Sequence, residues 1–189
     1  MVVFGGIVAT AETTKNDVWT LDLNTNVWTE QTTSSTKPSG RYFHSSILYN
    51  GQMVVFGGRS ANTNGLSKKN DVWILDLTTY TWTQLNTTGT KPSVRDAHSS
   101  ILYNDQMVVF GGRDDIEEND AWTLDLKQSP PVWSEQTTTG TKPSARYNHS
   151  SILYNEHMVM FGGRGSNTYN DVWTLDLSIL NIKMEEIDI

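Results

Sequence analysis

A pattern of about fifty residues recurs along the chain, and this repeat constrains the fold more than any other feature. The segment His98–Gly112 has close copies at 44–58 and 149–163, and the second half of the same segment opens the chain at 1–6. Equivalent methionines follow one another at intervals of 52, 54 and 51 residues; they are Met1, Met53, Met107 and Met158. Such a period indicates units that bury their apolar surface against their neighbours.

Each repeat contains four short segments with the character of β-strands. In the third repeat, residues 98–103 and 107–110 are rich in β-branched and aromatic side chains. The intervening Asn104-Asp105 tolerates the positive φ that a tight hairpin needs. The next segment, 120–126, alternates apolar and polar side chains, and a fourth, more polar strand contains Trp133. No segment has helical periodicity of useful length.

The spacing between these segments varies in two places only. The double glycine and the following Asn-Asp pair are separated by nine, eleven, six and six residues, and the Asp-Leu pair and the next tryptophan by four, four and six. From that tryptophan to the next repeat's methionine the distance is always 25 residues. This pattern is typical of rigid strands that carry one variable loop.

The recurring glycines, tryptophans and arginines resemble the kelch motif. A double glycine ends the second strand, tryptophans stand in the third and fourth strands, and an arginine stands three residues before the recurring histidine. The arginines are Arg41, Arg95 and Arg146, and the glycine pairs are 5–6, 57–58, 111–112 and 162–163. The resemblance implies a β-propeller with the first strand of each blade innermost.

The sequence therefore predicts an all-β, kelch-type β-propeller in a single domain, 1–189. Four antiparallel blades of four strands are expected at approximately 1–36, 37–90, 91–141 and 142–189, the first without its innermost strand. Because such sheets are apolar on both faces, they must stack on one another. The tryptophans expected between blades are Trp19, Trp73, Trp122 and Trp173, and Met184 aligns with Trp133.

The first blade has no segment of the form Arg-x-x-His-Ser-Ser-Ile-Leu-Tyr, so the ring is expected to be incomplete. Two explanations stay open. The chain is either a fragment of a longer propeller, whose remaining blades the longer chain supplies, or an arc that self-association with another copy completes.

Composition excludes several functions. A net charge of −7 and a pI near 5.0 oppose nucleic-acid binding, which depends on basic side chains. No run of eighteen apolar residues is present to cross a membrane. Residues 1–11 have no basic region, and residues 1–6 match internal strands. The chain has no cysteine, so the cross-linked tyrosine–cysteine cofactor of kelch-type copper oxidases cannot form. This composition favours a cytoplasmic protein.

Residues that recur in every repeat are expected to serve the blade rather than an active site. His44, His98 and His149 therefore indicate a structural role and no metal site, and the repeated arginines and aspartates indicate blade-anchoring ion pairs. No catalytic or cofactor-binding residue is predicted. The alternative to a non-enzymatic protein is a sugar-processing enzyme or small-ligand binder that uses the channel mouth, similar to sialic-acid epimerases.

The variable loops after the double glycines predict a binding surface for a protein partner. In an antiparallel blade these loops lie on the same face as the links between blades, and the opposite face has short, uniform turns. The second loop is basic and the third is acidic, which would orient a partner electrostatically. The candidate residues are Arg59, Lys68, Lys69, Arg113, Asp114, Asp115, Glu117, Glu118 and Arg164.

Overall fold

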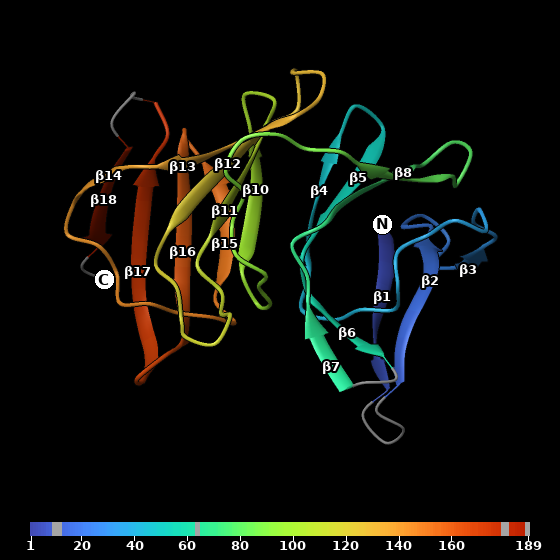
Figure 1. Ribbon diagram of the computed structural model, residues 1–189, viewed down its shortest axis with the longest axis horizontal. Helices are drawn as coiled ribbons and strands as arrows, with labels where there is room; N and C mark the ends of the chain where they lie inside the picture. Colours follow the sequence, from blue (N-terminus) through green and yellow to red (C-terminus); the bar gives the residue numbers. More distant parts are fainter. Residues whose placement is uncertain (9–12, 63–64, 179–181, 188–189) are drawn as a thin grey trace.

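Four sheets of three to five strands stand side by side in an open arc (Figure 1), and a fifth sheet is a two-stranded hairpin. This computed structural model describes residues 1–8, 13–62, 65–178 and 182–187. The first strands of neighbouring sheets contact one another, β4 (Ser45–Tyr49) with β10 (Ser99–Tyr103) and β10 with β15 (Ser150–Tyr154). Among the described residues there is no helix with the length and apolar character needed to cross a membrane. The predicted all-β blade architecture is confirmed.

Each sheet is one blade, numbered here 1 to 4 in chain order. Blade 1 has three strands, β1 (Val2–Val8), β2 (Thr13–Leu21) and β3 (Trp28–Gln31). Blade 2 contains β4, β5 (Gln52–Phe56), β8 (Val72–Asp76) and β9 (Trp82–Leu85); its β6 (Arg59–Asn62) and β7 (Gly65–Lys68) form a separate hairpin. Blade 3 contains β10, β11 (Gln106–Phe110), β12 (Ala121–Asp125) and β13 (Val132–Gln136).

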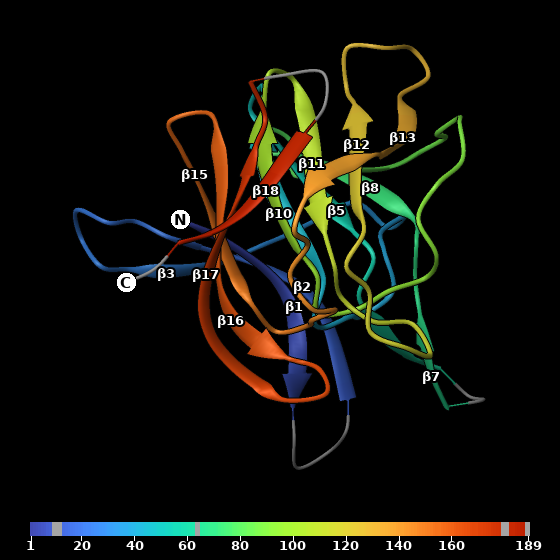
Figure 2. The ribbon, with the colours of Figure 1, turned by 90° about the vertical axis from the view of Figure 1, so that its left-hand side faces the viewer.

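Blade 4 is the other end of the arc, and Figure 2 looks onto this end. It contains β15, β16 (His157–Arg164), β17 (Thr168–Asp176) and β18 (Ile182–Ile187), and a short parallel strand, β14 (Thr138–Gly140), adds to its outer edge. The hairpin turns match the sequence prediction, because Asn104 and Asp105 both have positive φ, at 45° and 62°.

Apolar side chains fill the three junctions between blades. Between blades 2 and 3, Phe56 packs at 4.8 Å between ring centroids from Trp133, within one buried cluster. Met184 takes the place of Trp133 in blade 4, because it pairs with Leu175 as Trp133 pairs with Leu124. These clusters bury the tryptophans of the third strands at 5–8% exposure; they are Trp73, Trp122 and Trp173.

Neighbouring blades, rather than the blade itself, bury these residues. Trp82 and Trp133 are 3% and 2% exposed, whereas Trp28, at the same place in blade 1, is 48% exposed. Trp19 is likewise only half-buried, so the prediction that it packs between blades fails within this arc. At the other end, Phe161 of blade 4 is 53% exposed, whereas the equivalent Phe110 is fully buried.

A buried arginine anchors each complete blade. Arg95 Nη1 donates to the Gly111 carbonyl at 3.0 Å and to Asp120 Oδ1 at 2.7 Å, and Arg95 Nη2 donates to Asp120 Oδ2 at 2.8 Å. The Trp122 indole donates to the same carboxylate at 2.6 Å. Arg41 with Asp71 and Arg146 with Asp171 repeat this geometry. The predicted ion pairs are therefore confirmed.

The same arginines tie one blade to the next through their backbones. The Arg95 amide donates to the Lys69 carbonyl of blade 2 at 3.0 Å, and the Arg95 carbonyl accepts from the Gly58 amide at 2.9 Å. The links also cover the outer edge of the blade ahead, since Thr88 forms a parallel bridge with Val132. Covered edges have fewer free groups with which another chain could pair.

The histidine directly before each first strand packs against a phenylalanine of the preceding blade. His149 lies 5.7 Å from the Phe110 ring, and its Nε2 lies 2.8 Å from Ser99 Oγ. Burial, reinforced by the nearby Arg146 charge, lowers the pKa of His149 from 6.5 to about 4. The described residues contain no group of three or more His, Asp or Glu side chains that could hold a metal ion. The geometry supports a structural role for this histidine.

The arginine anchor predicts a difference between two aspartates at equivalent positions. Asp120→Asn is expected to lower the free energy of unfolding by about 3 kcal/mol, because it leaves the buried Arg95 without its carboxylate. Asp17→Asn is expected to change it by less than about 0.5 kcal/mol, since among the described residues Asp17 accepts only the Trp19 indole, at 3.2 Å. Urea unfolding followed by tryptophan fluorescence measures both. Equal losses would contradict the anchor.

We expect the folded protein to lose stability in mild acid, because His149 is buried in its neutral form. The pKa of His149 is lower in the folded state than in the unfolded state. Its contribution to the free energy of unfolding is therefore complete above pH 6.5 and declines toward pH 4, by about 2.5 kcal/mol at pH 4.5. The Asp171 carboxylate, whose pKa hydrogen bonds from Arg146 lower from 3.8 to about 2, loses its contribution only in more acidic solution. His149→Asn should therefore reduce the fall of the urea midpoint between pH 7 and 4.5 by this share, while His44 and His98, whose pKa values burial also lowers, keep their own shares. An unchanged slope would refute this assignment.

Candidate partner-binding face

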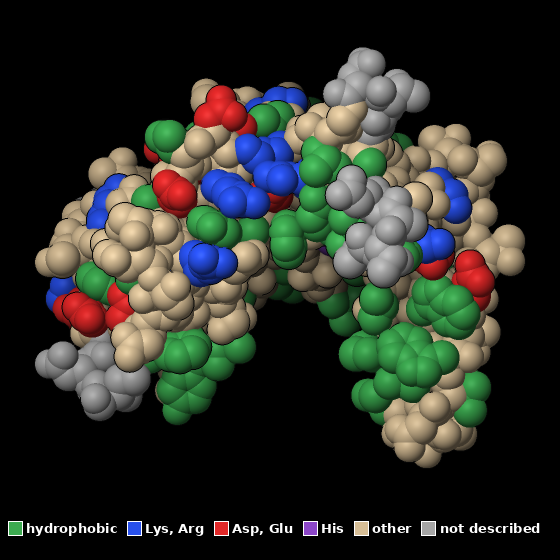
Figure 3. Space-filling view, turned by 90° about the horizontal axis from the view of Figure 1, so that it is seen from below, with side chains coloured by type: hydrophobic (Ala, Val, Ile, Leu, Met, Phe, Trp, Pro, Cys, Tyr) green, Lys and Arg blue, Asp and Glu red, His purple; other side chains and the backbone are tan. Residues whose placement is uncertain are grey.

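The loops after the double glycines and the links between blades meet at one end of the sheets. The β6–β7 hairpin of blade 2, the link into blade 3 and the first residues of the blade 3 loop together line an open cavity of about 300 Å³. Its walls are Arg59, Leu66, Lys68, Val94, Asp114 and Asp115. Figure 3 shows basic side chains gathered over the middle of the arc and hydrophobic ones at its two ends. We call this surface the loop face.

A buried carboxylate breaks the repeat at the centre of the loop face. Asp96 follows the anchoring arginine of blade 3, where blades 2 and 4 have Tyr42 and Tyr147. Asp96 is 0% exposed, and its carboxylate forms ion pairs with Arg59 Nε at 2.6 Å and with Arg113 Nε at 3.1 Å. We call these three residues the Arg59–Asp96–Arg113 cluster.

The cluster joins three blades and leaves its arginines able to bind more. Arg59 comes from blade 2, Asp96 and Arg113 come from blade 3, and the Arg113 guanidinium lies 4.4 Å from the centre of the Tyr147 ring of blade 4. Both arginines contact Asp96 through Nε and are 20% and 30% exposed. Among the described residues neither has a hydrogen-bond partner at Nη1 or Nη2, so these donors are available to a ligand.

The basic second loop and the acidic third loop contact each other. The Lys68 ammonium donates to the Asp114 backbone carbonyl and lies 3.8 Å from the Asp114 carboxylate. Part of the opposite charge predicted for these loops is thus paired inside the face. Asp115, Glu117 and Arg164 are exposed on it.

Lys69 and Glu118 hold the links through their backbones. Their carbonyls accept from the amides of Arg95 and Arg146, each at 3.0 Å. Burial, followed by repulsion from Asp120, raises the pKa of the Glu118 carboxyl. These two candidates from the sequence therefore lie at the base of the loops.

Sequence reasoning missed Asp96 and Tyr147. Both lie directly after the anchoring arginine, at a position outside the variable loops on which the sequence prediction rests. The change from tyrosine to aspartate and back was the available signal. The sequence does not indicate which residues pair with Asp96, since Arg59 lies in another blade.

Comparison with known proteins agrees with this architecture. The family model described as the KLHDC2/KLHL20/DRC7 Kelch-repeats domain matches residues 1–184. Tip elongation aberrant protein 1 of Schizosaccharomyces pombe is 31% identical over 176 residues, which are 90% of this chain and 15% of that protein. Kelch domain-containing protein 3 of Bos taurus is 32% identical over 171 residues, 84% of this chain and 44% of that protein.

Other similarities extend this picture. The Rho GTPase-activating protein gacHH of Dictyostelium discoideum is 33% identical over 158 residues, 76% of this chain and 10% of that protein. The chain thus spans less than half the length of each of these relatives. The solved structure of YjhT superposes with a TM-score of 0.74 at 16% identity, covering 91% of this chain and 58% of that chain, which shows the shared fold.

Repeats of this family generally mediate protein interactions. The family model covers nearly the whole chain, and the double glycines, anchoring arginines and paired tryptophans occupy equivalent positions in the sheets. The chain belongs to the Kelch-repeat family.

Proposed function

We propose that this chain is a non-enzymatic protein-interaction module whose partners bind the loop face at the Arg59–Asp96–Arg113 cluster. The observation that carries the proposal is the buried Asp96, which replaces a tyrosine of the other blades and orients two arginines from different blades. Residues that differ between copies of a rigid repeat are the ones free to serve a ligand.

The chemistry of the cluster favours a partner with acidic side chains. The ion pair with Asp96 already holds each guanidinium at Nε. Binding a carboxylate through the free Nη donors therefore costs little further side-chain conformational entropy. Arginine is enriched among the residues that dominate interface energies. Within the cluster, one carboxylate between two guanidinium groups leaves one excess positive charge, and Asp114 and Asp115 stand in the wall of the adjoining cavity.

Apolar side chains beside the cluster supply further contact area. Leu66 on the β6–β7 hairpin is 54% exposed, Val94 in the link is 36% exposed, and Ile116 in the third loop is 68% exposed. A charged centre with apolar neighbours suits a protein partner, because interfaces combine desolvated anchors with surrounding contacts that exclude water.

Removing the two guanidinium groups tests the proposal. Arg59→Gln with Arg113→Gln is expected to weaken partner binding at least tenfold, since a hydrogen bond to a charged group contributes about 1.5–3 kcal/mol. The variant also leaves the buried Asp96 without its cations, so urea unfolding must first show that it is folded. Cross-linked affinity capture and quantitative mass spectrometry would identify the partner, and titration with that purified partner would measure the affinity.

The matched control removes two positive charges far from the loop face. Lys127 lies in the turn between β12 and β13 on the opposite face, where it pairs with Asp105 at 2.7 Å, and Lys183 lies on β18. Lys127→Gln with Lys183→Gln should leave the affinity unchanged. If both double variants bind equally well, the loop face is not the binding surface.

Charge reversal in the third loop measures how far the interface extends. Replacing the exposed Asp115 and Glu117 by lysine is expected to raise the affinity for the same acidic partner at least threefold, because rim charges steer association. This pair leaves the contact between Lys68 and Asp114 in place. Association and dissociation rates at two salt concentrations provide the measurement, and unchanged rates would remove this loop from the interface.

A further inference from the structure

The third loop is a hydrogen-bonded projection on the loop face. Its ends form an antiparallel bridge between Arg113 and Glu117, and the Asp114 amide donates to the Ile116 carbonyl at 3.0 Å. Ile116 is 68% exposed, and Asp115 and Glu117 on either side of it are exposed as well. The loop therefore presents one apolar side chain between two carboxylates. We call residues 115–117 the acidic knob.

The side chains of the acidic knob have no partner within the part of the chain that the structure describes. Neither the Asp115 nor the Glu117 carboxylate has an ion pair or a hydrogen bond there, whereas the neighbouring Asp114 pairs with Lys68. Ile116 lies outside the three buried apolar clusters. The knob thus carries apolar surface and charge that these contacts of the fold do not use.

The open cavity beside the knob has the opposite chemistry. Its wall contains the apolar Leu66 and Val94 together with the basic Arg59 and Lys68. Leu66 is 54% exposed, so its apolar surface is accessible to another molecule. An isoleucine between two carboxylates complements an apolar wall between basic side chains, in both hydrophobic contact and charge.

The knob does not fill the cavity of its own chain. Asp114 and Asp115, at the start of the knob, form part of the wall of that cavity. Ile116 is not among the lining residues and stays largely exposed. A knob that stands at the rim of its own cavity can reach an equivalent cavity only in another molecule.

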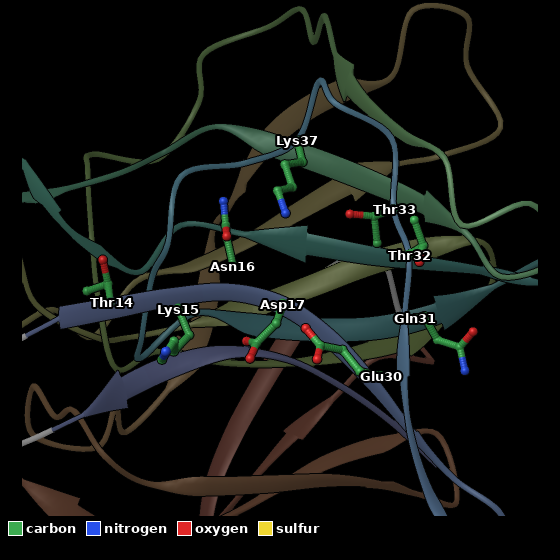
Figure 4. A pocket seen from close by; sticks show the side chains of 9 residues that line it. All are labelled: Thr14, Lys15, Asn16, Asp17, Glu30, Gln31, Thr32, Thr33 and Lys37. Atoms are coloured by element: carbon green, nitrogen blue, oxygen red, sulfur yellow. The ribbon is translucent and has the colours of Figure 1, made fainter.

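A larger cavity elsewhere in the molecule does not match the knob. This cavity of about 630 Å³ lies on blade 1, and Figure 4 shows the residues that line it. All of them are polar or charged, among them Lys15, Asp17 and Glu30. Such a wall offers an isoleucine no apolar contact that would favour its removal from water.

The knob and the cavity adjoin on one face, and this makes the loop face complementary to a copy of itself. When a patch with two complementary halves meets a copy rotated by 180°, each half contacts the other half of its partner. Two identical contacts then form together, and the second gains from the high effective concentration that the first creates.

We propose that the loop face binds a second copy of this chain in a two-fold symmetric dimer. The knob of each copy places its isoleucine against Leu66 and Val94 of the other copy, and its carboxylates pair with free Nη donors of the Arg59–Asp96–Arg113 cluster. The proposal rests on the proposed function, because both use the arginines of this cluster. A second copy and an acidic partner therefore compete for the same donors.

Sedimentation equilibrium of the knob variant tests this dimer. Asp115→Lys with Glu117→Lys is expected to weaken self-association at least tenfold, because each of the two contacts loses its attraction and gains repulsion from the arginines. Glu30→Lys with Glu186→Lys is the matched control. It makes the same change in net charge on exposed positions of β3 and β18, and it should leave self-association unchanged within about twofold.

A second variant removes the basic half of the contact without leaving a buried charge unpaired. Arg59→Gln, Asp96→Asn and Arg113→Gln together take away the buried carboxylate with both of its cations, and urea unfolding shows whether the variant is folded. Alone, it should also self-associate at least tenfold more weakly. Mixed with the knob variant, it should form a heterodimer more tightly than either variant forms its own dimer, since one intact knob then meets one intact cluster.

Three results would overturn the proposal. They are no dimer of the unmodified protein at about 1 mM, a dimer that the knob variant leaves unchanged, and a mixture that associates no more tightly than its two components. A dimer that the control variant weakens and the knob variant does not would place the contact at blades 1 and 4, and it would overturn the proposal too. All of these results leave the proposed function standing, because the affinity for an acidic partner is measured separately.

Discussion

The stacking of sheets that are apolar on both faces is the interaction on which the whole molecule depends. A single blade of this composition would expose both of its apolar faces to water, so a blade needs neighbours to be stable. The contrast between Trp133, buried at 2%, and Trp28, exposed at 48%, shows that the neighbour decides the burial. Strand spacing is fixed because each side chain must reach the same point of the next sheet.

The anchoring arginine connects this packing to the loop face. Its guanidinium is buried with two acceptors inside the blade, and its backbone bonds to the blade before it. The residue that follows the arginine therefore has a fixed position at the loop face. Asp96 occupies this position in blade 3, and this explains why one changed residue can reach arginines from two blades.

Most of the fold could be predicted from the sequence because aligning the copies of the repeat shows which positions of the strands are equivalent. Copies of one segment reveal which positions cannot change, and strand alternation assigns those positions to a face. The hairpin at Asn104 and Asp105, the burial of Trp122 and the substitution of Met184 for Trp133 all follow from this comparison. The parallel pairing of β14 with β18 does not, since nothing in the polar segment 138–140 indicates a strand.

The candidate site could be predicted less well because its contacts join residues that the repeat does not relate. Lys68 and Asp114 belong to loops of different length, so no register aligns them, and their contact depends on how the two backbones turn. The sequence shows Asp96 as a break in the repeat, but the role of Asp96 in holding two arginines depends on its burial. A carboxylate at 0% exposure is costly unless cations surround it. Asp96 therefore constrains both arginines together, and a change at one of them alters the field in which the other binds.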